Sequence, residues 1–397
     1  MTSPVDQTAA ALGRARLAAA AGFATQGLVF ISLTTRLPDF SDRWHLSEVE
    51  LSGLLLMMVL LAGVGSVVAE TLARQHDSAT LLRAGLAVIA LGVPVMALAP
   101  ATGVFVAGMA AYGVALGVVD ASTNMQAVAL EHRYARPILP SFHGAWTLGG
   151  LVGSAITLAT AHLPLGTTAA LAVIPLVVLA GPFLKRVGDP LASGPQIEVP
   201  WRPIILVGVA MVLFYMVDTA AFTWGPTYLD HVFPTPSSLV ALATFPYLLA
   251  SGAMRLAGDT VVARFGPVAV LRVGALVACA GLAVVVFAPT WQVAVLGFLV
   301  MGAGVAVIAP LSFSAAARIA GGADDLDPHL RHARVDAVIG RFNQFNYLGA
   351  LIGAVLTGLV GSGDLRFGFA VPMVLVLGIL PLARAFAPAG PANSQLR

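Results

Sequence analysis

Long runs of apolar residues, separated by short polar or Pro/Gly-containing breaks, recur along the whole chain. They lie at residues 17–37, 51–70, 81–99, 103–130, 141–163, 166–184, 204–229, 237–258, 268–288, 290–318, 335–360 and 366–387. A helix needs about 20 mainly apolar residues to cross a bilayer, so the pattern predicts twelve transmembrane helices. The sequence lacks the alternating segments of a membrane β-barrel, and we expect an all-α membrane protein.

The longest polar stretch between these runs divides them six and six. It covers residues 185–203, which leaves an N-terminal half at 1–184 and a C-terminal half at 204–397. We expect two six-helix halves joined by a linker on the cytoplasmic side.

The two halves also resemble one another. At an offset of 189 positions, spans 2 to 4 match spans 8 to 10, and past span 4 the offset becomes 200. The matches include Gly63 with Gly252, Arg83 with Arg272, Ala99-Pro100 with Ala288-Pro289, Phe142 with Phe342 and Gly149 with Gly349. Two halves that cross the membrane in the same orientation are related by a rotation axis along the membrane normal. In membrane proteins built this way, the substrate lies near the membrane midplane, between the halves.

Composition narrows the class further. Hydrophobic residues make up 58% and charged residues 10% of the chain, whereas a soluble domain carries about 25% charged residues. This excludes most soluble enzymes of this length. The net charge of +2 is too balanced for nucleic-acid binding. Cys279 is the single cysteine, so no intramolecular disulfide or thiolate metal site is expected, and no cofactor is predicted.

Basic residues gather on one side of the predicted membrane. Eighteen of the Lys and Arg residues, Arg255 among them, fall at the termini or near alternate loops, and only Arg36, Arg43 and Arg366 fall on the other side. Because basic residues favour the cytoplasm, both termini are predicted to be cytoplasmic, in a multi-pass inner-membrane protein.

Ionisable residues inside a span are costly and mark functional candidates. Asp120 lies well inside span 4, with Asn124 one turn on, and Asp218 lies midway along span 7. We expect both acids to take up and release protons. Their alternative role is hydrogen bonding to a neighbouring helix.

Other polar and aromatic side chains fall at matching depths in the two halves and are predicted to bind substrate. His143 and Trp146 lie one turn apart in span 5, and the 200-residue offset places Asn343 and Asn346 opposite them in span 11. The full predicted set is Gln26, Asn124, His143, Trp146, Trp224, Tyr228, Asn343, Asn346 and Tyr347. A hydrogen-bonded packing role is the alternative for a membrane histidine.

Charges at the cytoplasmic helix ends are predicted to close the inward mouth by pairing across the halves. These residues are Glu70, Arg74, Glu131, Arg136, Asp259 and Arg264. Solvated pairs are weak individually, so a gate needs several. The alternative interpretation is that these charges only set the membrane topology.

These residues resemble a known family. The segment Gly117-x-x-Asp120-x-x-x-Asn124, followed by Glu131, Arg136-Pro137 and Phe142-His143-Gly144, is similar to the span 4–5 signature of the fucose-permease-like branch of the major facilitator superfamily. Gly258-Asp259 with Arg264-Phe265-Gly266 resembles the general loop motif of the superfamily. The resemblance implies the major facilitator fold and a proton-coupling role for Asp120. The chain departs at Thr34, where sugar–proton symporters of this branch carry a second acid.

We therefore expect a secondary active transporter that works by alternating access, not an enzyme. It would move a small polar solute such as a sugar-like metabolite, coupled to protons, as a monomer in the lipid bilayer. The alternative within transport is a proton-driven exporter of a lipophilic metabolite or drug. A membrane enzyme using His143 as base is disfavoured because no nucleophile or metal-ligand motif accompanies it. A membrane sensor is disfavoured because no output module is present.

Overall fold

The computed structural model describes residues 4–73, 75–134, 138–185, 201–321, 338, 342 and 344–387, without the side chains of residues 4–9, 131, 132, 139, 140 and 259. The N-terminal part comprises α1 (Pro4–Thr35), α2 (Leu37–Trp44), α3 (Glu48–Leu72), α4 (Ser78–Ala97), α5 (Thr102–Tyr134), α6 (Leu139–Thr160), the 3₁₀ helix η1 (Leu165–Ala172) and α7 (Val173–Leu179). The C-terminal part comprises α8 (Trp201–Val232), η2 (Ser237–Ala243), α9 (Phe245–Phe265), α10 (Pro267–Val286), α11 (Trp291–Val305), α12 (Ile308–Gly321), α14 (Gln344–Val360), α15 (Leu365–Leu375), η3 (Val376–Gly378), α16 (Ile379–Leu382) and η4 (Ala383–Phe386).

Nine helical segments within the described part of the chain are long and apolar enough to cross a bilayer. They correspond to nine of the twelve predicted spans. The other three predicted spans fall on α6, on the shorter apolar segment Leu165–Leu179 and on α14. The structure thus confirms the all-helical membrane architecture, and the total of twelve spans remains a prediction. The short helix α2 between α1 and α3 was missed because it forms no long apolar run.

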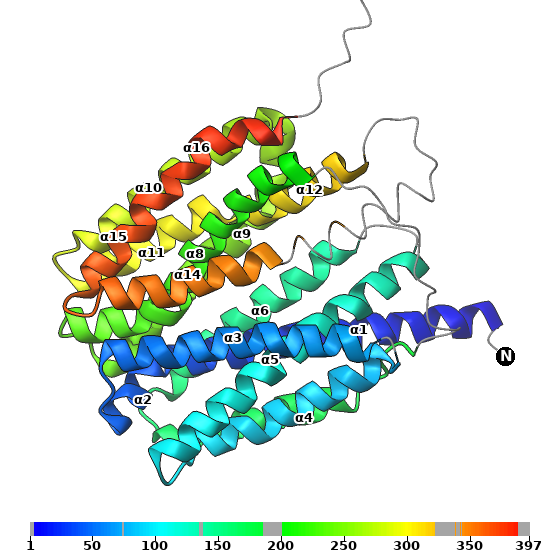
Figure 1. The fold of residues 1–397 in the computed structure, drawn as a ribbon, viewed down its shortest axis with the longest axis horizontal. Coiled ribbons are helices and arrows are strands. Elements are labelled where there is room, and N and C mark those ends of the chain that lie inside the picture. The colour runs from blue at the N-terminus through cyan, green and yellow to red at the C-terminus, as the bar shows by residue number, and fades with distance from the viewer. Residues whose placement is uncertain are drawn as a thin grey trace, which may run out of the picture.

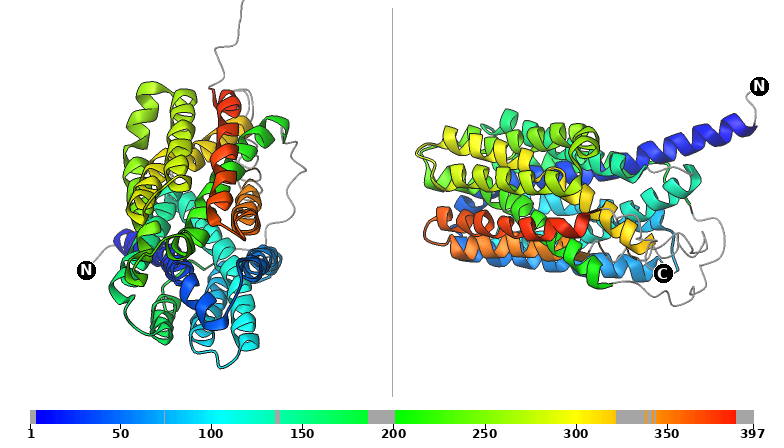
Figure 2. Two further views of the ribbon diagram at one scale, coloured as in Figure 1. Left: turned by 90° about the vertical axis from the view of Figure 1, so that its left-hand side faces the viewer. Right: turned by 90° about the horizontal axis from the view of Figure 1, so that it is seen from above.

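The helices form two groups that lie side by side along their length, α1–α7 in one group and α8–α16 in the other (Figures 1 and 2). The internal packing of the groups is equivalent. The pair α1–α6 corresponds to α8–α14, and the pair α3–α5 corresponds to α9–α11. Across the groups, α3 runs beside α14 and α1 contacts α8. We call the surface where the two groups meet the central junction.

Glycines at repeat-related positions bring equivalent helices into close contact. An added Cβ at Gly149 would overlap the carbonyl oxygen of Ala24, and one at Gly349 would lie 2.5 Å from that of Val212. Small residues at such crossings let membrane helices approach closely. The two glycines are related by the offset of 200, so the sequence repeat is reflected in the helix packing. The residue boundaries of the halves remain a prediction.

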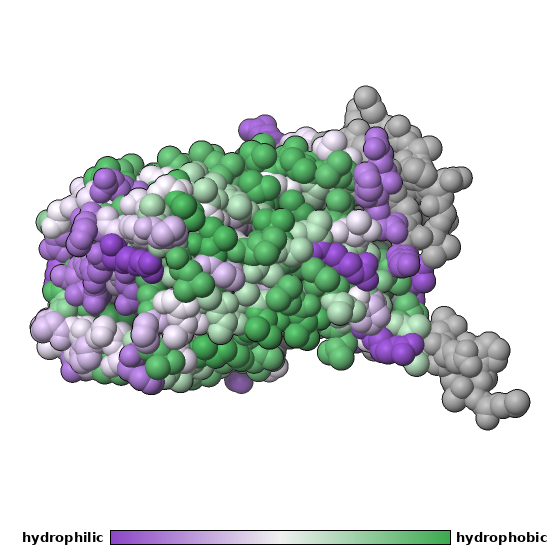
Figure 3. Space-filling view, turned by 90° about the horizontal axis from the view of Figure 1, so that it is seen from below, coloured by the Kyte–Doolittle hydropathy of each residue, from purple (hydrophilic) through white to green (hydrophobic). Residues whose placement is uncertain are grey.

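The molecular surface carries a broad apolar band with polar residues at both ends (Figure 3). One end, which we call the basic end, carries Arg14, Arg133, Lys185, Arg202 and Arg264. The opposite end, which we call the acidic end, carries Asp39, Asp42, Glu48, Glu50 and Asp230. The start of α1 projects beyond the basic end (Figure 2).

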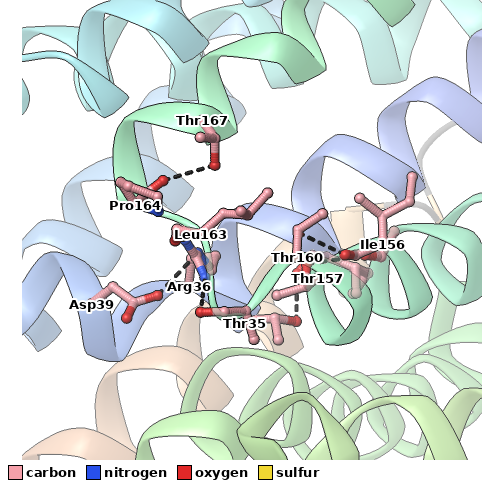
Figure 4. A network of polar contacts seen from close by, with 12 residues as sticks. Thr35, Arg36, Asp39, Ile156, Thr157, Thr160, Leu163, Pro164 and Thr167 are labelled. Carbon is pink, nitrogen blue, oxygen red and sulfur yellow. Dashed lines mark hydrogen bonds and ion pairs between the residues drawn. The ribbon is translucent and has the colours of Figure 1, made fainter. Parts of the chain in front are cut away.

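Arginines at the acidic end bind the carbonyl groups that terminate helices. Arg36 donates to the carbonyl oxygens of Ala161 and Leu163, at 3.3 and 3.0 Å, and forms an ion pair with Asp39 at 3.0 Å (Figure 4). Burial raises the pKa of Asp39 above its ordinary value, although Arg36 acts in the opposite direction. These contacts fasten the α1–α2 turn to the end of α6.

Candidate functional site

Asp120 lies in the interior of α5 and accepts hydrogen bonds from both groups of helices. Gln26 of α1 donates to Oδ1 at 3.3 Å, and the hydroxyl of Tyr347 on α14 donates to Oδ2. Asn124, one turn along α5, donates to the Asp120 backbone oxygen at 2.9 Å and to Oδ1 at 3.5 Å. The carboxyl group therefore joins α1, α5 and α14 through a single set of contacts.

A second acid occupies the opposite side of the central junction. Asp218 on α8 is buried and accepts a hydrogen bond from the hydroxyl of Tyr247 on α9. Tyr215, one turn before it on α8, lies within electrostatic range of Asp218, Arg255 and Asp120. Tyr215 is therefore near enough to both acids to be influenced by the charge of each.

Arg255 makes a polar contact across the junction. Its Nη1 donates to the hydroxyl of Thr147 on α6 at 2.8 Å, and its Nε donates to the carbonyl oxygen of Ala306 at 3.2 Å. Arg255 also lies within electrostatic range of Asp218 and His143. The junction therefore holds a cation as well as two acids.

Aromatic rings form a row through the same region. The ring of His143 packs edge-on against Phe23 at 5.4 Å between centroids and stacks against Phe313 of α12 at 6.3 Å. Phe313 continues the row to Phe342 at 5.3 Å, and Phe342 to Phe345 at 5.4 Å. The row crosses from one group of helices to the other at His143.

Neutral hydroxyl groups join the two groups closer to the acidic end. The hydroxyl of Thr244 lies 3.0 Å from that of Ser154 on α6 and 3.4 Å from that of Thr35 on α1. All three residues are fully buried. Glu48 on α3 and His231 on α8 approach to 3.5 Å at this end. The acidic end of the junction is therefore closed in this structure.

Comparisons with known proteins agree with this architecture. No family model matches the sequence. The chain is 27% identical to an uncharacterised transporter of Sinorhizobium fredii, over 75% of this chain and 81% of that protein. It is 26% identical to an uncharacterised MFS-type transporter of Yersinia pestis, over 91% of this chain and 93% of that protein.

Solved structures of several transporters share the fold. A POT family transporter in complex with 5-aminolevulinic acid superposes with a TM-score of 0.72 at 12% identity, over 94% of this chain and 96% of that chain. The D323A mutant of the nucleoside transporter NupG gives 0.67 at 13% identity, over 95% and 98%. FucP in the outward conformation gives 0.60 at 16% identity, over 94% and 98%.

The protein is a multi-pass membrane transporter with the major facilitator fold. It is a secondary transporter and not an enzyme. FucP is one of several structural neighbours, which also include a nucleoside transporter and a POT family transporter, so the superfamily-level part of the resemblance is confirmed and the branch stays a prediction.

The transporter structure brings only part of the predicted site together. Gln26, Asp120, Asn124 and Tyr347 form one cluster. His143, Trp146 and Asp218 lie at the same junction, Trp146 with its ring 5.9 Å from that of Phe222 on α8. Asn346 is half-buried beside Tyr347 on α14.

Trp224 and Tyr228 lie apart from this cluster, Tyr228 within the packing of the C-terminal helices and Trp224 against Gly358 of α14, which also contacts Ser52 of α3. Both are fully buried. The Trp224 indole donates to the Ala354 carbonyl oxygen at 2.6 Å, and the Tyr228 hydroxyl donates to that of Val285 at 2.5 Å. Their polar atoms are satisfied by backbone groups, which is what a packing role requires, and contact with a substrate remains a prediction for both.

Most of the predicted gate lies outside what the structure describes. Arg74, Arg136 and the candidate binding residue Asn343 fall outside the described residues, as do the side chains of Glu131 and Asp259. Glu70 is exposed near the end of α3, and the guanidinium of Arg264 lies 5.3 Å from the Phe265 ring centroid. The gate therefore remains a prediction.

Sequence reasoning missed Tyr215, Tyr247, Thr147 and, above all, Arg255. The sequence alone assigns Arg255 to the charges at helix ends because the apolar run stops at residue 258. The helix instead continues to Phe265 and stops at Gly266, whose φ of 75° suits glycine. A glycine after the last helical turn is a common helix stop, and this signal would have placed Arg255 inside the helix.

Proposed function

We propose that this transporter moves a small polar solute by alternating access, coupled to protons, with Asp120 as the principal proton site. The observation that carries the proposal is the contact of Asp120 with α1 and α14 at once. The basic end would face the cytoplasm of a bacterial inner membrane, with both termini on that side, and the protein would act as a monomer. The similarity to the fucose-permease-like branch supports this assignment.

Protonation of Asp120 would weaken the contact across the junction. A hydrogen bond to an ionised carboxylate is roughly twice as strong as one between neutral groups. Asp120 lies nearer to the end of α5 at the basic end than to its start, and Tyr347 lies in the first turn of α14. A proton on Asp120 therefore loosens the side of the junction that faces the cytoplasm in the proposed orientation.

The solute would bind beside Asp120, among Gln26, Asn124, His143, Trp146 and Asn346, with Asp218 as a second proton site. Gln26 and Asn124 supply amide groups, and the Gln26 side-chain oxygen is buried with no recorded partner in the described part of the chain. Trp146 and His143 supply flat surfaces on which a sugar-like solute can stack.

The test is solute-driven proton movement in proteoliposomes with an imposed pH gradient, using a panel of sugars, polyols and sugar acids. Asp120→Asn should abolish proton movement while counterflow exchange of the same solute persists. Tyr347→Phe, which removes only the donor, should retain coupling with altered rates. Asp42→Asn, at an exposed acid of the acidic end, is the matched control. Unchanged proton movement in Asp120→Asn would refute the proposal.

An exporter of a lipophilic compound is the second candidate, and the aromatic row at His143 favours it. Rings from Phe23, Phe313, Phe342 and Phe345 line up through the junction. Uptake and efflux measured on the same vesicles separate the two candidates, because an exporter moves solute against the inward proton flow.

The cytoplasmic gate is proposed to consist of Glu70, Arg74, Glu131, Arg136, Asp259 and Arg264. Replacing Glu70 and Asp259 by Gln and Asn together should increase the reactivity of cysteines introduced on the basic side of the junction. Unaltered reactivity on both faces would argue against a gating role.

A further inference from the structure

Arg255 lies deep within a membrane helix. It is ten residues before the end of α9 at Phe265, which corresponds to about 15 Å along the helix axis. An arginine near the middle of a membrane span costs at least about 2.5 kcal/mol on insertion scales, so such residues serve a partner or a pathway. The question is therefore which partner this guanidinium has.

The protein supplies Arg255 with neutral partners. Its two recorded hydrogen bonds go to the Thr147 hydroxyl and the Ala306 carbonyl oxygen. Within the described residues it makes no ion pair, and no partner is recorded for Nη2. The side chain is half-buried, so its charge is neither neutralised by a direct partner nor sealed from the junction.

The nearby acid is engaged elsewhere. Asp218 lies within electrostatic range of Arg255, but its Oδ1 accepts the hydroxyl of Tyr247. The other groups near Arg255 are His143 and Thr147 on α6 and Tyr215 on α8. This leaves a half-buried guanidinium with a hydroxyl and aromatic side chains in its surroundings and no carboxylate bonded to it among the described residues.

We propose that Arg255 binds the anionic group of the transported solute, so that the substrate is an organic anion, most simply a carboxylate; this inference rests on the transport function proposed above. The planar guanidinium fork matches the two oxygens of a carboxylate. The Thr147 hydroxyl accepts from Nη1 and donates to the His143 carbonyl oxygen at 3.2 Å, so it holds the guanidinium in place. When Asp218 is ionised, its carboxylate competes with the anionic solute for electrostatic attraction to Arg255.

The competing interpretation is that Arg255 only ties α9 to α6 through Thr147. The two interpretations differ in what removes binding. An anion site depends on the positive charge and gains affinity when the competing acid is neutralised. A purely structural contact between α9 and α6 depends on the Thr147 hydroxyl, and added anions do not change it.

The experiment uses the purified full-length protein in detergent and matched acid and amide probes. The probes are acetate with acetamide, benzoate with benzamide, and inorganic phosphate, titrated at constant ionic strength while the unfolding temperature is followed. At least one anion should stabilise the wild type while its uncharged counterpart does not. Arg255→Gln should weaken that binding by about tenfold or more, since a hydrogen-bonded charge is lost. Arg255→Lys should restore part of it.

Three further variants distinguish the two interpretations. Asp218→Asn should strengthen anion binding about fivefold or more, because a like charge near the site is removed. Arg202→Gln, at an exposed arginine of the basic end, should bind as the wild type does. If Arg255→Gln fails to fold, Thr147→Val keeps the cation without the tie and should still bind the anion.

The proposal is overturned if no anion stabilises the wild type, if acids and amides act equally, if stabilisation persists in Arg255→Gln, or if Thr147→Val abolishes it. These measurements need no membrane gradient. Failure of proton coupling at Asp120 would leave anion binding intact, so the two proposals fail separately.

Discussion

The hydroxyl groups that close the acidic end offer a direct way to shift the conformational equilibrium. Thr244→Val replaces the central hydroxyl by a methyl group of similar size. It removes the contacts of Thr244 with Ser154 at 3.0 Å and with Thr35 at 3.4 Å. We expect the closed arrangement to lose stability relative to one in which the acidic end is open.

The size of the effect depends on the hydrogen bonds that Ser154 and Thr35 keep in the variant. Ser154 can still donate to the Ala241 carbonyl oxygen at 3.3 Å, and Thr35 donates to that of Ile31 at 2.7 Å. Neither partner is left as a buried donor without an acceptor, so the loss is one or two ordinary hydrogen bonds, about 1–2 kcal/mol. Water replaces these bonds in the open arrangement, so the loss falls on the closed state. The equilibrium should shift toward opening by roughly 5–30-fold.

The assay is a spin-label distance measurement across the acidic end. Ala101→Cys and Thr290→Cys place labels on exposed loops of the two halves, in a background carrying Cys279→Ala. Thr244→Val should increase the long-distance population. Thr157→Val is the matched control, because the Thr157 hydroxyl bonds only the Gly153 carbonyl oxygen of its own helix. Identical distance distributions in Thr244→Val and the control would refute the reasoning.

Three further predictions concern the stability of the folded protein. Gly117→Ala should lower the unfolding temperature through about 1–3 kcal/mol of overpacking, since its Cβ would overlap the Ala62 carbonyl oxygen, whereas Gly103→Ala meets open space and should not. Tyr228→Phe should cost about 1 kcal/mol of stability and leave solute affinity in transport assays unchanged. Arg43→Gln and Arg366→Gln should each lower the unfolding temperature, because each variant loses hydrogen bonds to two carbonyl oxygens. The decrease should be similar in the two variants.

The helical architecture was predictable because bilayer thickness imposes it. Apolar runs of span length appear in the sequence directly, and the predicted run at 268–288 and helix α10 at Pro267–Val286 nearly coincide. The repeat was predictable because close helix contacts require small residues at fixed positions, as at Gly149 and Gly349. Both features depend on local composition, which a single sequence displays.

The direction in which a side chain points was less predictable. Helix α8 is buried over most of its surface, so hydropathy cannot separate the face toward the junction from the face toward its own group. Asp218 lies on the first face, and Tyr228 lies on the second, where the Val285 carbonyl oxygen accepts its hydroxyl. Cross-junction partners such as Tyr347 for Asp120 are 227 positions apart in sequence, and no local pattern encodes such a pairing.

The contacts across the junction differ in chemistry from one end to the other, and that difference gives the proposed mechanism its direction. Toward the acidic end the fully buried contacts are those of the Thr35, Ser154 and Thr244 hydroxyls, which carry no charge, and the partly exposed Glu48–His231 pair lies at the same end. Toward the basic end they involve Asp120 and Arg255, which we propose respond to a proton and to an anion, respectively. A ligand shifts a conformational equilibrium only by its unequal affinity for the two states. In the proposed mechanism, protons and solute therefore act on the basic-end contacts, and the hydroxyl cluster adds a bias toward the closed state that does not depend on them.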